Sequence, residues 1–242
     1  MTLLRISLIP LKIAPRNVTD NIRHFVTQLD QVRPHQPDLV CLPECCFTGY
    51  MYEDADLARF AEPVPGPTTA EMSRLAQAYG VYLCFGLLES TPQGVYDTAI
   101  LLDRNGAIAG FHRKLSEKPP FINGTVVNSI ETEFGKLGML VCADLFAEEV
   151  VARLDPALKL LLVPTARSFD GGSPDRLRWE KEERQSYLDA VHHAGIPAVI
   201  TNTLETSSVD ALFGGALVVS AQGELLAESP HGSDEILVYD LD

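Results

Sequence analysis

The sequence predicts an α/β protein whose sheets are covered by helices on their outer faces. Its 242 residues contain many short apolar runs of the kind that form buried strands. Helical patterns occur early in each half of the chain, and the order of predicted strands and helices in the second half resembles that in the first. Strands and helices distributed in this way favour layers of helix packed against layers of sheet.

The first half alternates apolar strands with two helices. One amphipathic helix opens at Asn17 and runs to Val32, and another is capped by Thr68 or Thr69 and runs to Tyr79. The dipeptide Asn105-Gly106 between two apolar runs predicts a hairpin. The strands of this half are expected at residues 3–9, 39–42, 81–88, 97–102 and 107–111.

The second half repeats this arrangement with more strands. Helices are expected at 148–154 and 174–194, and a glycine-rich loop at 169–175. A turn at 221–224 is expected to join the last two strands. The predicted strands of this half are 126–132, 136–141, 158–163, 198–203, 216–220 and 236–241.

Composition narrows the class of protein. The content of 46% hydrophobic and 21% charged residues is ordinary for a globular chain, and a net charge of −14 argues against nucleic acid or an acidic membrane as partner. Five cysteines, with Cys45 and Cys46 adjacent, indicate reduced thiols and not a disulfide framework. The N-terminal apolar run is broken by Arg5 and Pro10, so we expect neither a secretion signal nor a membrane span, and a cytoplasmic location.

Three segments place a reactive side chain just beyond an apolar strand. Glu44 follows the strand at 39–42, Lys114 follows the return strand of the hairpin, and Cys142 follows the strand at 136–141. A thiol at a strand-to-helix turn lies where backbone N–H groups and a helix dipole favour the thiolate. Each segment alone is a weak signal, because a buried cysteine, a loop glutamate and a surface lysine are common.

Taken together and in this order, the segments PECCFTGY, HRKL and GKLGMLVCADLF resemble those of the nitrilase superfamily of carbon–nitrogen hydrolases. The resemblance covers nearly the whole chain, and we expect residues 1–242 to form a single carbon–nitrogen hydrolase domain. It implies a four-layer α-β-β-α sandwich that assembles into a homodimer or a higher homo-oligomer. It also implies an enzyme that uses neither a metal nor another cofactor.

The resemblance implies a catalytic role for each of these residues. Cys142 would attack an amide carbonyl, and Lys114 with the backbone N–H of Ala143 would stabilise the oxyanion. Glu44 would take the thiol proton, give it to the leaving amine and then activate water. Glu117, in a segment similar to one that carries a second glutamate in many members, would orient Lys114 or the substrate.

Other candidate residues have weaker support. Tyr50 and Thr165 are predicted to contact the substrate, and Arg167 either meets a substrate carboxylate or lies at the surface. A metal site is not expected, because no second Cys/His pair lies at zinc-type spacing from the cysteines at 41, 45 and 46. A Cys–His enzyme that uses His192 or His193 is an alternative, although both follow a helical pattern that favours a helix-end or interface role.

These observations predict a hydrolase that cleaves a small linear amide, ω-amide or N-carbamoyl compound through a thioester. Nitrile hydrolysis is less favoured, because nitrilases commonly carry Trp-Glu after the cysteine, where this chain has Ala143-Asp144. One alternative is a glutaminase-type module that supplies ammonia. Another is a catalytically silent scaffold subunit, which the departures from the family pattern at Ala143 and at 192–193 keep open.

Overall fold

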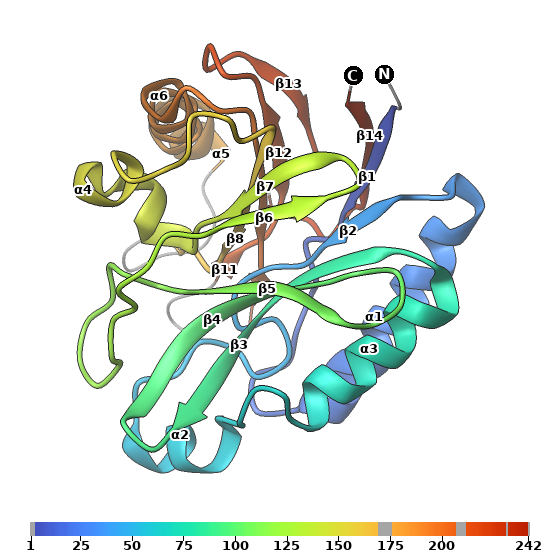
Figure 1. Ribbon diagram of the computed structural model, residues 1–242, viewed down its shortest axis with the longest axis vertical. Helices are drawn as coiled ribbons and strands as arrows, with labels where there is room; N and C mark the ends of the chain where they lie inside the picture. The colour runs from blue at the N-terminus through green and yellow to red at the C-terminus, as the bar shows by residue number, and fades with distance from the viewer. Residues whose placement is uncertain (1–2, 169–175, 207–211, 231, 242) are drawn as a thin grey trace.

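The computed structural model describes residues 3–168, 176–206, 212–230 and 232–241. Two six-stranded sheets are present, and helices cover the outer face of each sheet, which gives an α-β-β-α sandwich (Figure 1). The predicted four-layer α/β fold class is therefore confirmed.

The first sheet combines the N-terminal strands with the last strand of the chain. In spatial order its strands are β14 (Leu237–Leu241), β1 (Leu4–Leu8), β2 (Leu39–Cys41), β3 (Tyr82–Thr91), β4 (Gly94–Leu102) and β5 (Ile108–Arg113). The β1, β2 and β3 strands are parallel, and the other neighbours are antiparallel. Because β14 pairs with β1, the two ends of the chain lie side by side (Figure 1).

The second sheet has the same mixture of parallel centre and antiparallel edges. Its strands in spatial order are β13 (Leu225–Glu228), β12 (Ala216–Val219), β9 (Ala198–Asn202), β8 (Leu160–Thr165), β7 (Gly135–Met139) and β6 (Ser129–Thr132). The parallel strands are β7, β8 and β9. Two short strands, β10 (Leu204–Glu205) and β11 (Leu212–Phe213), pair separately.

The helices form the outer layers of the sandwich (Figure 1). The first sheet is covered by α1 (Val18–Val32) and α3 (Pro67–Tyr79). The second is covered by a continuous helical stretch made of α5 (Arg176–Arg178), the π-helical η3 (Trp179–Glu183) and α6 (Arg184–Ala194). The shorter helices are η1 (Arg33–His35), α2 (Asp54–Phe60), η2 (Cys142–Phe146) and α4 (Glu148–Val151).

Strand alternation divides the apolar residues between the layers. In β8, Leu160 and Leu162 pack between the two sheets, whereas Leu161 and Val163 face the helices that cover the second sheet. Such two-sided burial explains why the central strands are continuous apolar runs and not alternating patterns. The parallel centres of both sheets therefore form a rigid frame for the loops that follow their strands.

The predicted start of the first helix is confirmed, and that of the second is wrong by two or three residues, because its N-cap is Gly66. Asn17 caps α1 and accepts a hydrogen bond from the backbone N–H of Asp20 at 3.4 Å. The α3 helix instead begins at Pro67, because the Glu62 carboxylate accepts the Thr68 N–H at 2.8 Å and satisfies one of the free donors of the first turn.

Several elements were not predicted. The α2, β10, β11 and β13 elements are short, and none carries a clear period of its own. The turn at 221–224 leads into β13 and not directly into the last strand. The predicted helix at 174–194 contains the π-helical turn η3, and its first two residues, like the predicted loop at 169–175, lie outside the described residues.

Candidate active site

Glu44 is held in a tight loop directly after the parallel strand β2. Its side chain is completely buried, and its backbone carbonyl accepts a hydrogen bond from the Thr203 hydroxyl at 3.0 Å. The loop passes so close to β3 that a Cβ atom at Gly86 would lie only 2.6 Å from the Glu44 Cα. The glycine at position 86 therefore allows the glutamate to enter the space between the sheets.

Lys114 lies directly after β5, and its ammonium group is enclosed by acidic groups. Its Nζ lies 2.7 Å from Glu44 Oε1, 2.5 Å from Glu117 Oε2 and 3.5 Å from Asp97 Oδ2. The side chain of Lys114 is only 5% exposed. Tyr50 donates a hydrogen bond to Glu117, and its hydroxyl oxygen lies 3.4 Å from Nζ. The structure thus brings Glu44, Glu117, Lys114 and Tyr50 together.

The carboxylates keep Lys114 charged despite its burial. Burial by itself would lower the pKa of the ammonium group, but Glu44, Asp97, Cys142 and Glu117 together outweigh that effect and raise the pKa. A permanently charged, water-shielded ammonium group is well suited to stabilise a developing negative charge.

Cys142 occupies a strained turn between β7 and the short helix η2. Its φ of +46° lies in the left-handed region that residues with a Cβ rarely adopt. The buried carboxylate of Asp144 holds this turn against the loop that follows Lys114, because it accepts the N–H groups of Leu115 at 3.0 Å and Ser116 at 2.9 Å. His112 donates to the second oxygen of the same carboxylate at 2.7 Å. The thiol-bearing turn and the lysine loop are thereby joined.

The surroundings of Cys142 oppose the thiolate that the sequence led us to expect at this turn. Burial of the Cys142 thiol, followed by the nearby Glu44 charge, raises its pKa. The ammonium group of Lys114 and the backbone N–H of Ala166 act in the opposite direction without outweighing these two effects. This direction favours the protonated thiol, which needs a base before it can act as a nucleophile.

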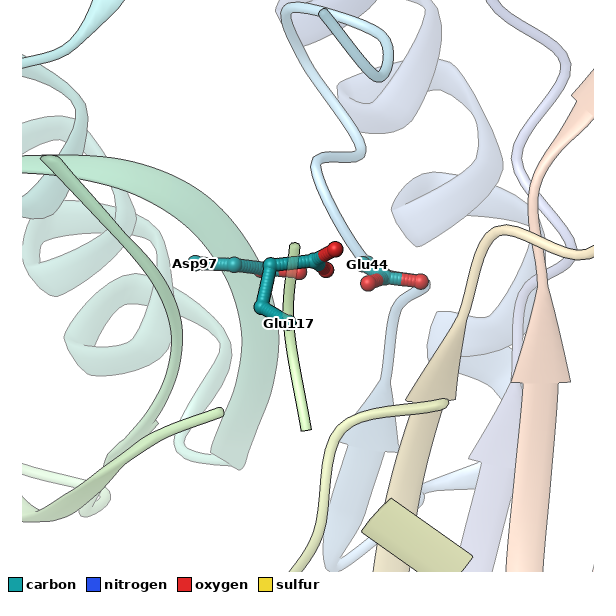
Figure 2. A group of neighbouring side chains, drawn as sticks. All are labelled: Glu44, Asp97 and Glu117. Atoms are coloured by element: carbon teal, nitrogen blue, oxygen red, sulfur yellow. The ribbon is translucent and has the colours of Figure 1, made fainter. Parts of the chain in front are cut away.

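Three carboxylates of this cluster lie close enough to one another to coordinate a single cation. One oxygen each of Glu44, Asp97 and Glu117 lies within 4.8 Å of the others, and Figure 2 shows the three side chains from different parts of the fold meeting in one place. The ammonium group of Lys114, however, contacts all three. Since this organic cation already occupies the space among the carboxylates, the donor set does not fit an additional metal ion.

The three other cysteines considered above lie apart from one another, and the two histidines differ from Cys142 in exposure. Cys41 packs between the sheets, Cys46 packs under the first helical layer and Cys45 packs in a separate small apolar cluster, so the three thiols do not converge on one point. His192 and His193 are exposed near the end of α6, whereas Cys142 is half-buried at the turn after β7. These positions favour neither a metal site nor a Cys–His pair.

The two candidates that follow β8 have different surroundings. The Thr165 side chain is fully buried, and its hydroxyl donates to the backbone carbonyl of Thr201 at 3.1 Å. Arg167 is neither free nor simply at the surface: its guanidinium group lies 3.3 Å from Glu183. Ala143 is half-buried beside the candidate nucleophile.

Sequence reasoning missed three contributors to the site. Asp97 and His112 each lie in a strand that is otherwise largely apolar. A polar residue within such a strand was the signal that could have identified them as functional candidates. Asp144 is part of the segment that carries the cysteine, but its contacts with the lysine loop depend on the tertiary fold.

Comparison with known proteins identifies the family. The model of the carbon-nitrogen hydrolase family matches residues 5–242. The chain belongs to this family. It is 24% identical over 271 residues to an aliphatic nitrilase of Sinorhizobium fredii (strain HH103), with 100% of this chain and 87% of the relative covered. It is 25% identical over 254 residues to the omega-amidase NIT2 of Homo sapiens, with 99% of this chain and 88% of the relative covered.

A solved structure shows the same fold. A single-residue mutant of the amidase from Nesterenkonia sp. AN1, with the acetamide moiety of fluoroacetamide added covalently at its active-site cysteine, superposes with a TM-score of 0.83 at 21% identity. The alignment covers 98% of this chain and 90% of that one. The family model and the curated relatives identify the protein as a carbon–nitrogen hydrolase of the amidase-type branch of the nitrilase superfamily.

Proposed function

We propose that this protein hydrolyses the C–N bond of a small linear amide, ω-amide or N-carbamoyl compound, with Cys142 as nucleophile. The observation that carries the proposal is the buried ammonium group of Lys114, held 2.7 Å from Glu44 and 2.5 Å from Glu117 beside the strained turn of Cys142. A base, a fixed positive charge and a thiol are the three groups that this chemistry needs.

The first half of the reaction forms a thioester and releases the amine. Glu44 takes the thiol proton as the Cys142 sulfur attacks the carbonyl carbon, and Lys114 with the backbone N–H of Ala143 stabilises the oxyanion. Glu44 then gives the proton to the nitrogen, the C–N bond breaks, and ammonia or an amine leaves. Glu117 holds the Lys114 ammonium group in place through the 2.5 Å contact, and Tyr50 holds Glu117.

The second half releases the acid. Glu44 removes a proton from water, the water oxygen attacks the thioester carbon, and the C–S bond breaks. The proton on Glu44 then returns to the sulfur of Cys142. One carboxylate thus serves as base, acid and base again, which is why its position next to both the thiol and Lys114 matters.

Both the sequence around the cysteine and the relatives support an amide as the substrate. Ala143-Asp144 follows Cys142, where a nitrilase would commonly carry Trp-Glu. One relative is an omega-amidase, and the structural neighbour is an amidase that carries an acetamide moiety. Because an aliphatic nitrilase has a similar identity, nitriles belong in the substrate test as well.

The experiment is ammonia release from a panel of short amides, ω-amides, N-carbamoyl compounds and nitriles, with intact mass measured in parallel. The wild type should turn over at least one amide, and Cys142→Ala should lose turnover and the acyl adduct. Cys84→Ala is the matched control, because Cys84 is a buried free thiol in the core between the sheets. Turnover that persists in Cys142→Ala contradicts the proposal. If the wild type releases no ammonia from any compound of the panel, the result favours a scaffold subunit.

Glu44→Gln separates the two halves of the reaction. Glutamine cannot accept the proton of the attacking water, so an acyl adduct formed with an activated substrate should persist on Cys142. Steady-state turnover should fall by about 100- to 10,000-fold, the usual range for loss of a general base. An adduct that decays at the wild-type rate would show that another group activates water.

Three further expectations remain proposals. We propose that residues 1–242 form one domain, that the protein assembles into a homodimer or a higher homo-oligomer, and that it acts in the cytoplasm. Among the described residues, none of the helices combines the length and apolar character needed to cross a bilayer. Light scattering coupled to size-exclusion chromatography measures the assembly directly.

A further inference from the structure

The cluster around Lys114 contains more acid than its reaction requires. The mechanism uses Glu44 as base and Glu117 as the partner that holds Lys114, but Asp97 from β4 is a third carboxyl group in contact with the same ammonium group (Figure 2). If all three were ionised, one positive charge would face three negative charges in a space that is almost free of solvent. Uncompensated buried charge is costly, so one of these groups must carry a proton.

The distances indicate which carboxyl group it is. Glu44 and Glu117 lie 2.7 and 2.5 Å from the ammonium nitrogen, whereas Asp97 lies 3.5 Å away. Glu117 also accepts the Lys118 N–H at 2.8 Å and a hydrogen bond from Tyr50. The other oxygen of Asp97 accepts a long hydrogen bond from the Cys45 thiol, at 3.8 Å. As an anion, Asp97 would have the weakest stabilisation of the three.

One carboxylate oxygen of Glu44, in contrast, accepts no hydrogen bond. Its Oε2 is buried without a hydrogen-bond partner, although its Oε1 accepts from Lys114. A buried carboxylate oxygen without a donor is unusual. One carboxyl oxygen of Asp97 lies within 4.8 Å of an oxygen of Glu44, and a carboxyl group that carries a proton can donate it to a neighbouring carboxylate.

We propose, on the basis of the function proposed above, that Asp97 is a positioning residue that retains a proton in the working enzyme and donates it in a hydrogen bond to Glu44. The proton stays on Asp97 throughout the reaction, and no bond to Asp97 breaks. Glu44 and Glu117 are then the two ionised carboxylates, and the cluster has one net negative charge. When Glu44 takes the thiol proton, that charge moves to the sulfur and then to the oxyanion beside Lys114, without a change in the total.

The environment of Asp97 supports this assignment. Complete burial, followed by the negative charge of Glu44 and their shared hydrogen bond, raises the pKa of Asp97 well above its ordinary value, and Lys114 only partly opposes this. Burial also raises the pKa of the Cys45 and Cys142 thiols and of the Tyr50 phenol, so these groups stay neutral near pH 7. They therefore add no charge that would change the protonation of Asp97. The facing groups are Glu44, Glu117, Lys114, Cys45, Tyr50 and Cys142.

Asp97→Asn and Asp97→Ala test the proposal as a pair. Asparagine has the shape of a protonated aspartate and keeps an N–H donor, whereas alanine removes the donor. Asp97→Ala should therefore lower kcat/KM by roughly tenfold, the factor expected for one lost hydrogen bond, and Asp97→Asn should recover most of that loss. The acid limb of the pH profile should stay at the wild-type midpoint in Asp97→Asn. In Asp97→Ala it should move about one pH unit higher, because the charged form of Glu44 has lost a donor.

If Asp97 is ionised, a different shift of the acid limb of the pH profile is expected in Asp97→Asn. Asp97→Asn would then remove a negative charge from the cluster, and the acid limb of the pH profile would move to lower pH. A downward shift in Asp97→Asn, or a failure of asparagine to recover the activity that alanine loses, would overturn the proposal.

Infrared spectroscopy of the resting protein tests the proton without any substrate. The wild type at pH 7 should show the carbonyl stretch of a protonated carboxylic acid, shifted in D₂O, and Asp97→Asn should lack this band while Glu131→Gln, at an exposed carboxylate, should keep it. The absence of the band from the wild type would overturn the assignment even if amide turnover is found. If the band is present but the protein turns over no amide, the proposed function is contradicted, whereas the assignment of a proton to Asp97 is supported.

Discussion

Arg113 and Lys114 are neighbours in the sequence, but the fold places them in contrasting ionic environments. The Arg113 side chain is 33% exposed, donates to both oxygens of Glu89 at 2.6 and 2.7 Å, and stacks over the Tyr96 ring. The Lys114 side chain is 5% exposed and faces three carboxyl groups. The first cation is matched by one anion, and the second is surrounded by an excess of acid.

This difference separates a structural ion pair from a reactive cluster. A bidentate arginine–glutamate pair has all its charges satisfied and no proton to exchange. A lysine among three acids must hold at least one proton on a carboxyl group, and that state is sensitive to every neighbouring charge. Since successive side chains at the end of a strand point to opposite sides, one step along the chain is enough to separate the two environments.

The comparison is tested most severely by Lys114→Met, which keeps the length of the side chain and removes the charge. The oxyanion loses its positive partner, so kcat/KM should fall by at least about 100- to 1,000-fold. Three buried carboxyl groups are left without a cation, so the free energy of unfolding should fall by about 3–5 kcal/mol at pH 7. Amide turnover and urea unfolding measure the two effects.

The pH provides an internal control for this variant. Protonation of the remaining carboxylates removes the uncompensated charge, so the stability deficit of Lys114→Met should shrink between pH 7 and pH 5. A deficit that is the same at both pH values would mean that the loss comes from packing and not from charge.

Most of the fold was predictable because it depends on local patterns. The buried strands are continuous apolar runs, and Asn17 and Gly80 mark a helix start and a helix end in the way that short-range sequence signals predict. The fold also places Glu44 and Lys114, which follow two different strands, in contact with each other. Their positions in the sequence, together with the family resemblance, were therefore sufficient to predict that they meet.

The rest depends on tertiary partners that no local pattern reports. Asp97 gains its importance from Glu44, which is more than fifty residues away in the sequence, and the pKa of Cys142 depends on burial and on that same glutamate. The start of α3 was misplaced for a similar reason, because Glu62 takes the Thr68 N–H. Motifs predict which groups meet, whereas their protonation follows from solvent exclusion and from the sum of nearby charges.

The next largest effect is expected for Asp144→Ala, which separates the lysine loop from the turn of Cys142. The change leaves the N–H groups of Leu115 and Ser116 without their acceptor, so stability should fall by about 2–3 kcal/mol. Misplacement of two reacting groups should lower kcat by about 10- to 100-fold. Asp144→Asn, which keeps an oxygen for the two donors, should lose less of both; equal losses in the two variants would contradict this role.

The pH dependence of stability tests the excess acid directly. Because the pKa of Asp97 in the folded protein lies above its ordinary value of 3.8, its contribution to stability is complete below that pH and is lost as the pH rises through the folded-state pKa. The stability of the wild type relative to Asp97→Asn should therefore fall with rising pH by up to about 1.4 kcal/mol per pH unit within this window. Urea unfolding between pH 4 and pH 8 measures the difference, and a flat line would indicate an Asp97 of ordinary acidity.

The smallest effect is expected for Arg113→Gln, the matched change on the other side of the comparison. Glu89 keeps the hydrogen bond that Thr98 donates at 2.8 Å, and the guanidinium group it loses is partly screened by solvent. The free energy of unfolding should fall by only about 1 kcal/mol, and this loss should decrease further in high salt, which weakens exposed ion pairs. Amide turnover should stay within about twofold of the wild type, because Arg113 contacts none of the reacting groups proposed here. If Arg113→Gln instead reduced kcat/KM as severely as Lys114→Met, the division between a balanced structural pair and a proton-holding cluster would fail, and both cations would belong to one functional network.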